Sequence, residues 1–220
     1  MIPSAKPTRR CLLGVGLALG APVAAWSNIA GPRRLVFEVW RGSHRIGRHS
    51  LDFNGDDKTF VVSINAAMAI SLGPIPLFRY SHQATETWRG GRFLALTSHT
   101  VSNGRREQVS ANRTPQGLVV ETLAGARTLG SDTLPFTHWN QHALQGPLFN
   151  PQTGAQVRER LVSRQEGQSV RLANAQAVPA TRYAMSGEAE IVDWYDTSGV
   201  WTALHGQVRD GSFIDYRRVI

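Results

Sequence analysis

The feature that most constrains the fold is a strict two-residue alternation of apolar side chains. Between residues 59 and 70, every second position is apolar and the positions between are mostly small or polar: Phe60, Val62, Ile64, Ala66, Met68 and Ile70 form the apolar set. Consecutive side chains of an extended strand point to opposite faces, so this pattern predicts a long strand with one buried face. Leu35, Phe37 and Val39 repeat the pattern.

Turn signals recur along the chain at nearly regular spacing. They include Gly42-Ser43, Asn54-Gly55, Gly90-Gly91, Asn103-Gly104, Ser198-Gly199 and Asp210-Gly211. Asn-Gly and Asp-Gly pairs favour the tight turns of β-hairpins. The sequence therefore predicts an all-β fold, a curved antiparallel meander with at most one short helix. A sheet of roughly ten or more strands must curl to bury one face, which gives an open or closed β-barrel.

Two segments interrupt this pattern. Residues 71–79 are apolar but contain Pro74 and Pro76, so they are not expected in a central strand. Residues 134–154 include a stretch around 139–144 that suits one short helical turn. We expect both segments to act as lids at a barrel mouth, or as a plug that closes one end.

The N-terminal residues have the pattern of an export signal. Positive residues are followed by an apolar run, 12–25, which is shorter than the roughly 20 residues that a membrane span needs. Small residues at 23–25 predict cleavage after Ala25. The stretch "TRRCLL" resembles a twin-arginine signal, with the general secretory route as the alternative.

This reading fixes the predicted domain organisation. Residues 1–25 are a cleavable signal peptide, 26–32 a flexible lead-in and 33–220 a single β domain that works in the periplasm or as a secreted protein. No stable membrane span is expected after cleavage. The only cysteine, Cys11, lies in the signal, which excludes thiolate metal sites, disulfides and cysteine nucleophiles from the remainder.

The charge distribution argues against a nucleic-acid partner. The formal net charge is +8, and Lys6, Arg9 and Arg10 contribute three of these charges. The remaining arginines are scattered and interleaved with acids, whereas nucleic-acid binding favours a concentrated basic face.

No established catalytic motif is present, and the sequence assigns no catalytic residue, metal ligand or cofactor. His138 and His142 are four residues apart, but the helix that would align them is doubtful. His82 and Glu86 share a strand face roughly 13 Å apart, so neither reaches the other directly. Asp193 and Asp196 have odd spacing, which sends them to opposite faces of a strand.

Aromatic residues are the better candidates for a ligand site. Such side chains combine an apolar body with a polar group, as ligand cavities require, although they also pack barrel cores. The predicted ligand-lining residues are Trp88, His138, Trp139, Trp194, Tyr195 and Trp201. On the strand around 194 we expect Trp194 to face inward, because Val192 shares its face.

The C-terminal third resembles a known family. Arg182-Tyr183, Trp194-Tyr195-Asp196 and Trp201 match its pattern, as do "YSHQATETWRGGR" (80–92), "THWNQ" (137–141) and "QTG" (152–154). These motifs are similar to the exported bacterial family known as domain of unknown function 6134, over roughly residues 35–220. The resemblance implies export and a β fold, and it supplies no catalytic residues.

Three functions remain open at this point. The first is a binding or carrier module for an apolar or amphiphilic ligand, which predicts a sizeable apolar cavity. The second is an envelope hydrolase or isomerase with a cross-strand site drawn from His82, Glu86, His138 and Tyr195. The third is a structural or interaction protein of the envelope. Whether the protein is an enzyme, and its oligomeric state, stay undecided.

Overall fold

One antiparallel sheet of thirteen strands dominates the fold of the described residues. The structure is a computed structural model, and it describes residues 32–56, 58–208 and 210–219. The predicted signal peptide and nearly all of the lead-in lie outside these residues. The strands of the large sheet are β1 (Arg34–Arg41), β2 (His44–Gly55), β3 (Thr59–Leu72), β4 (Ile75–Arg89), β5 (Arg92–Ser102), β6 (Arg105–Thr114), β7 (Gly117–Thr122), β8 (Gly125–Leu129), β11 (Arg160–Arg171), β12 (Ala177–Ser186), β13 (Ile191–Asp196), β14 (Trp201–Gln207) and β15 (Phe213–Arg218).

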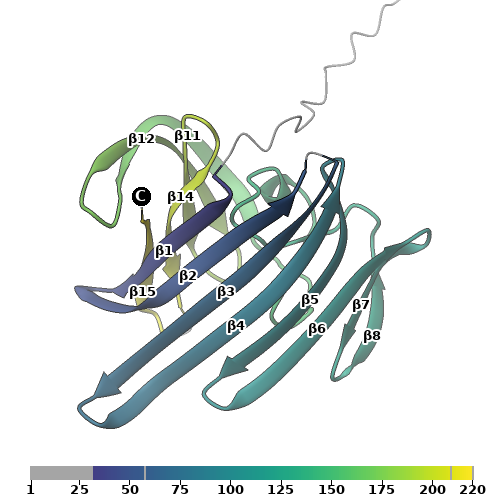
Figure 1. Ribbon diagram of the computed structural model, residues 1–220, viewed down its shortest axis with the longest axis horizontal. Coiled ribbons are helices and arrows are strands. Elements are labelled where there is room, and N and C mark those ends of the chain that lie inside the picture. The colour runs from purple at the N-terminus through teal and green to yellow at the C-terminus, as the bar shows by residue number, and fades with distance from the viewer. Residues whose placement is uncertain (1–31, 57, 209, 220) are drawn as a thin grey trace, which may run out of the picture.

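The sheet is strongly curved but not closed (Figure 1). β15 pairs with β1, so the spatial order runs β11-β12-β13-β14-β15-β1-β2 and on to β8. β8 and β11 are the two edge strands, and they do not pair with each other. The predicted fold class is therefore confirmed, in its open form.

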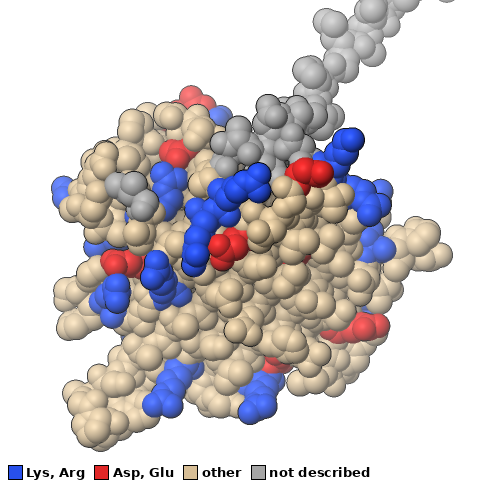
Figure 2. Space-filling model, in the orientation of Figure 1, with Lys and Arg blue, Asp and Glu red and all other residues tan. Residues whose placement is uncertain are grey.

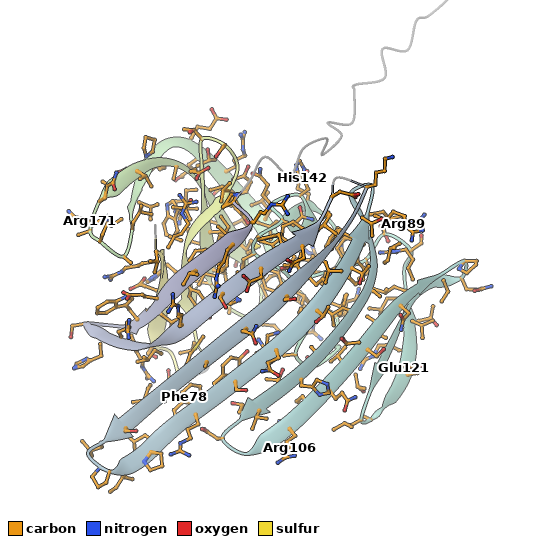
Figure 3. The ribbon with its side chains drawn as sticks, in the orientation of Figure 1. Phe78, Arg89, Arg106, Glu121, His142 and Arg171 are labelled. Carbon is orange, nitrogen blue, oxygen red and sulfur yellow. The ribbon has the colours of Figure 1, made fainter. Side chains whose placement is uncertain are left out.

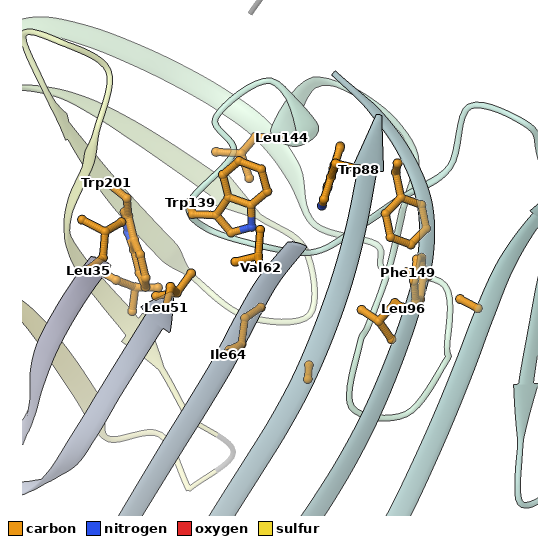
Figure 4. Close-up of a cluster of buried hydrophobic side chains, with 14 of the residues drawn as sticks. Leu35, Leu51, Val62, Ile64, Trp88, Leu96, Trp139, Leu144, Phe149 and Trp201 are labelled. Atoms are coloured by element: carbon orange, nitrogen blue, oxygen red, sulfur yellow. The ribbon is translucent and has the colours of Figure 1, made fainter. Parts of the chain in front are cut away.

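The alternating pattern places the core on the concave face. Val62 and Ile64 of β3 are buried there, and so are Leu35 of β1, Leu51 of β2 and Leu96 of β5. Figure 4 shows Val62 next to Trp139, Leu35 and Leu51 next to Trp201, and Leu96 next to Phe149. Trp139, Leu144 and Phe149 come from outside the large sheet.

The residues that fill the concave side are 130–159, which we call the inner segment. It contains two short parallel strands, β9 (Leu134–Pro135) and β10 (Leu148–Phe149), and one 3-10 turn, η1 (Ala143–Gln145). Of the two roles expected for 134–154, the structure shows the plug rather than the lid. The helical turn is present, slightly later than predicted. No helix in the described residues is long and apolar enough to cross a membrane.

For residues 71–79, the expected role as a lid or plug is wrong, whereas the expectation that they lie outside the central part of the sheet holds. They do not interrupt the sheet but form the end of the β3–β4 hairpin, which extends beyond its neighbours (Figure 1). Pairing of β2 with β3 stops at Met68, and pairing of β5 with β4 stops at Tyr80. Pro76 therefore lies in a two-stranded ribbon, where its missing N–H removes no bond to a third strand. We call residues 69–79 the β3–β4 tip.

Candidate functional site

A cavity of about 100 Å³ lies between the inner segment and the concave face of the sheet. β2, β3 and β4 form one wall, the inner segment forms another, and β14 and β15 contribute one aromatic residue each. The lining residues are His49, Leu51, Ile64, Ala66, Tyr80, His82, Glu86, Phe136, Thr137, His138, Pro151, Gln152, Trp201 and Tyr216. The cavity is small and about half of its lining is polar, which corrects the expectation of a sizeable apolar cavity.

Glu86 is the most deeply buried charged residue of the lining. Its Oε2 accepts hydrogen bonds from the indole N–H groups of Trp88 (2.9 Å) and Trp139 (3.1 Å). Its Oε1 is buried and has no hydrogen-bond partner among the described residues. Burial raises the pKa of Glu86 to about 7, against the opposing effect of the hydrogen bonds from Trp88 and Trp139. Near neutral pH this carboxyl group is therefore present in both protonation states.

His49 is held by ring contacts rather than hydrogen bonds. Its ring meets Trp201 edge-on with centroids 5.7 Å apart, and Tyr216 at 5.6 Å. Both ring nitrogens are buried, and neither has a partner within the described residues. Burial, assisted by His138 and His82, lowers the pKa of His49 to about 3. The neutral ring offers one N–H donor and one acceptor nitrogen.

His82 is a second neutral imidazole in this wall. Its Nδ1 lies 2.8 Å from the Thr100 hydroxyl on β5, and burial lowers the pKa of His82 to about 4. Although His82 and Glu86 share the inner face of β4, no hydrogen bond joins them, as their spacing along the strand predicted.

His138 connects the inner segment to β13. Its Nδ1 lies 2.9 Å from Oδ2 of the fully buried Asp193, and Asp193 Oδ1 accepts the Trp201 indole N–H at 2.9 Å. The His138 ring stacks on Trp201 with centroids 5.3 Å apart. Tyr195 donates its hydroxyl to the His138 carbonyl at 2.7 Å. The imidazole is thus fixed in orientation at the cavity wall.

Five of the six predicted ligand-lining residues lie at the cavity or directly behind its lining. His138 and Trp201 line the cavity. Trp88 and Trp139 lie behind it and hold Glu86 in place. Tyr195 also lies behind the lining, because its hydroxyl bonds to the His138 backbone.

Trp194 does not face inward, which is a correction. Asp193 and Tyr195 are the buried residues of β13, whereas Trp194 is only half-buried and shares the other face with Val192. The alternation was misread because the inner face carries a carboxylate, Asp193. His138 and Trp201 satisfy this carboxylate, so an acidic residue occupies a core position.

Several lining residues were not foreseen. His49 lies on the face of β2 that also carries Leu51, so its position within the strand was the signal that could have identified it. Tyr80, Thr137 and Tyr216 carried no such signal, since their convergence depends on how distant strands and the inner segment meet. His142 is separated from His138 by non-helical backbone and is exposed. Within the described residues, no three His, Cys, Asp or Glu side chains are grouped to hold a metal ion.

The sequence was compared with those of known protein families. The profile of the family "Domain of unknown function (DUF6134)" matches residues 37–219. The chain belongs to this family. The match confirms the resemblance and includes all the cavity-lining residues of this DUF6134 protein.

A solved structure shares the fold of the DUF6134 domain. It is the crystal structure of a β-barrel-like protein of domain of unknown function DUF1849 from Brucella abortus, with a TM-score of 0.55 and 13% sequence identity. The alignment covers 84% of this chain and 94% of that chain. At this identity the similarity shows the fold alone. No curated protein matches the sequence.

Proposed function

We propose that this DUF6134 protein is a binding or carrier module for an amphiphilic small molecule whose uncharged polar end enters the cavity. The observation that carries the proposal is a set of three buried polar atoms at this cavity that have no hydrogen-bond partner among the residues the structure describes, Glu86 Oε1 and the two ring nitrogens of His49. Buried polar groups in folded proteins are nearly always hydrogen-bonded, so these atoms indicate a polar occupant. The cavity that adjoins both residues provides the space for it.

The electrostatics of the lining favour an uncharged polar group. Within the described part of the chain no lysine or arginine lines the cavity, and both His49 and His82 are neutral at pH 7 because burial lowers their pKa values. An anionic group would therefore be buried without a counter-charge, which is costly. Hydroxyl or amide groups match the donors and acceptors that His49 and Glu86 offer.

The size of the cavity and its surroundings favour an amphiphile over a wholly polar ligand. At about 100 Å³ the cavity is well below the roughly 300–1,000 Å³ of pockets that enclose drug-sized ligands. An apolar strip continues from it along the inner face of the β3–β4 hairpin. Ala66 and Tyr80 line the cavity, and the cross-strand pairs Met68–Tyr80 and Ile70–Phe78 follow. An acyl chain on this strip would extend from a polar end held by Glu86 and His49.

Calorimetric titration tests this proposal with three probes of equal chain length, each below its micelle concentration: monooctanoylglycerol, octanoate and octylamine. We expect the uncharged glyceride to bind most tightly. The His49→Phe variant keeps a ring but lacks both nitrogens, and it should bind the glyceride about tenfold more weakly, the equivalent of one lost hydrogen bond. His99→Phe, at an exposed position of β5, is the matched control. Equal glyceride binding by His49→Phe and the wild type would contradict the proposal.

A second candidate function is acid–base catalysis, as an envelope hydrolase or isomerase. The specific observation in its favour is the Asp193–His138 pair, in which a buried carboxylate orients an imidazole at a cavity wall that also holds Glu86. Three of the four residues first considered for such a site, all except Tyr195, line the same cavity. The lining contains no serine or cysteine nucleophile. Turnover of an uncharged ester that is lost in His138→Gln, while glyceride binding persists, would favour this function.

We also propose that the protein acts outside the cytoplasm, in the periplasm or after secretion, through the twin-arginine route. The support is the sequence "PTRRCLLGVGLALGAPVAA", which has the charge and apolar pattern of such a signal. Replacing Arg9 and Arg10 together with lysine should leave the folded protein in the cytoplasm. Unchanged export of that variant, detected by cell fractionation, would assign the general secretory route instead.

A further inference from the structure

We infer that the β3–β4 tip docks on the surface of an anionic lipid bilayer. Three large aliphatic side chains are exposed there, Leu72 (68%), Ile75 (59%) and Leu77 (59%). No charged residue occurs from Ala69 to Phe78. Exposed aliphatic residues that are contiguous, rather than scattered singly, mark interaction surfaces. This inference goes beyond the proposed function, because it concerns a surface that does not line the cavity.

The tip is a continuous apolar ribbon. Leu72 and Ile75 are cross-strand partners, Ile70 and Phe78 form another pair of the same ribbon, and Leu77 lies between these two pairs on β4, at the register shift beside Ile70 and Ser71. Among the described strands, none covers the ribbon on either side beyond Met68 and Tyr80. The tip is therefore able to enter the interfacial region of a bilayer while the rest of the sheet stays in water.

Arginine side chains flank the tip on the adjoining turn. The backbone N–H of Arg79, the last residue of the tip and its only charged one, donates to Asn103 Oδ1, which places the β5–β6 turn beside it. Arg105 and Arg106 follow this turn and are exposed, and Arg105 pairs with Glu107. Figure 2 shows an uncharged lobe at the lower left, at the end of the β3–β4 hairpin, with arginines beside it. In Figure 3, Phe78 and Arg106 mark the same end of the molecule.

The arginines beside the apolar tip favour an anionic lipid bilayer over a protein as the binding partner. A protein partner that covers an apolar ribbon requires no cationic rim, whereas an anionic bilayer offers a hydrocarbon boundary with phosphate groups immediately above it. Each basic residue near such a surface strengthens binding to it, and guanidinium groups bind phosphate with two parallel hydrogen bonds. The apolar tip matches the hydrocarbon boundary of the bilayer, and the flanking arginines match the phosphate groups above it.

Co-sedimentation with lipid vesicles tests the inference, using the chain from residue 26. We expect binding to vesicles made of equal parts phosphatidylglycerol and phosphatidylcholine, and much weaker binding to pure phosphatidylcholine. The triple variant Leu72→Ser, Ile75→Ser, Leu77→Ser should bind the anionic vesicles about tenfold or more weakly. Arg79→Gln with Arg106→Gln should also bind more weakly, with a smaller dependence on salt. Leu123→Ser is the matched control, since Leu123 is 70% exposed at the β7–β8 turn and should leave binding unchanged.

Three results would overturn the inference. The first is the absence of wild-type binding to anionic vesicles, and the second is binding that the triple variant retains in full. The third is a concentration-dependent dimer in sedimentation velocity that the triple variant abolishes, which would assign the tip to a second copy of the chain. Glyceride binding by the same triple variant, measured separately, shows whether the cavity is intact, so failure of this inference is distinguishable from failure of the proposed function.

Discussion

At the residue scale, the two carboxyl oxygens of Glu86 have different environments. Oε2 accepts the two indole N–H groups of Trp88 and Trp139 and so joins β4 to the inner segment. Oε1 has no partner among the described residues and adjoins the cavity. One side chain therefore contributes to the packing of the core and, in the function proposed above, to the recognition of a ligand, so its protonation state bears on both.

The protonation of Glu86 gives a pH prediction with a definite sign. Burial raises the pKa of Glu86 from 4.5 to about 7 in the folded protein. Between these values only the unfolded chain releases the proton, so this group lowers the free energy of unfolding as pH rises from 4.5 to 7. Glu86→Gln does not titrate at this position and still accepts both indole N–H groups. The variant should gain about 3 kcal/mol of stability relative to the wild type across this range.

Urea unfolding of both proteins at a series of pH values measures this difference. His49 and His82 have lowered pKa values, so they raise the free energy of unfolding as pH rises, but to the same extent in both proteins. Their contribution therefore cancels in the comparison. A difference between wild type and variant that stays constant with pH would show that the Glu86 pKa is not raised.

The two tryptophans near the β13–β14 turn test which faces of these strands are buried. Trp201 is fully buried, and Trp201→Ala should lower the free energy of unfolding by about 3–5 kcal/mol through lost burial and a cavity. Trp194 is half-buried on the opposite face of β13, so Trp194→Ala should cost less than half as much. Thermal unfolding of the two variants measures this. If both variants lose the same free energy of unfolding, Trp194 is buried as deeply as Trp201, and the sequence-based prediction that Trp194 faces inward is correct after all.

At the element scale, the inner segment depends on close packing against β6 and β7. Gly154 has a φ of +70°, and a Cβ added there would lie 2.6 Å from Thr122 Cγ2 and 3.1 Å from Val120 Cγ1. Gly154→Ala combines a disfavoured backbone conformation with this overlap, so it should lower the free energy of unfolding by about 2–4 kcal/mol. Gly211→Ala is the matched control, because Gly211 has a φ of +79° and open space around it, and should cost only about 1 kcal/mol.

Urea unfolding of the two glycine variants separates the contributions. The strain of the backbone is common to both positions, so the excess loss in Gly154→Ala measures how tightly the inner segment packs on the sheet. If the two variants lose the same free energy of unfolding, the inner segment packs loosely on the sheet and does not form a fixed wall of the cavity.

The elements that could be predicted from the sequence are those that local patterns determine. The alternation from Phe60 to Ile70 gave β3, and the turn dipeptides gave most of the hairpins. Pro74 and Pro76 were misinterpreted, because a proline that excludes a central strand is tolerated where the ribbon has no further neighbour. β13 was misread for a related reason, since its buried Asp193 is satisfied by residues of β14 and of the inner segment. Contacts of this kind have no signal in the local sequence.

At the scale of the whole molecule, the inner segment connects the two halves of an open sheet. β8 and β11 do not pair, so no backbone hydrogen bonds join the sheet edges. On one side, the Arg113 guanidinium of β6 donates to the carbonyls of Ser131 and Thr133. On the other side, the Tyr183 hydroxyl of β12 donates to Gln141 Oε1 at 3.0 Å. The cavity lies between the inner segment and the sheet. The polar lining of the cavity is the feature that supports a ligand, because the β-meander by itself carries no such indication.

In the proposed function the cavity binds the uncharged polar end of an amphiphile through His49 and Glu86. Native mass spectrometry of the protein, purified without detergent from the cells that naturally express it, detects such a ligand without any assumption about its identity. We predict an adduct in the wild type that fragments to an uncharged, hydroxyl- or amide-bearing amphiphile, and its loss in His49→Phe but not in His99→Phe. A wild-type protein that is free of ligand in every preparation, or an adduct that His49→Phe retains at the wild-type level, would contradict the account.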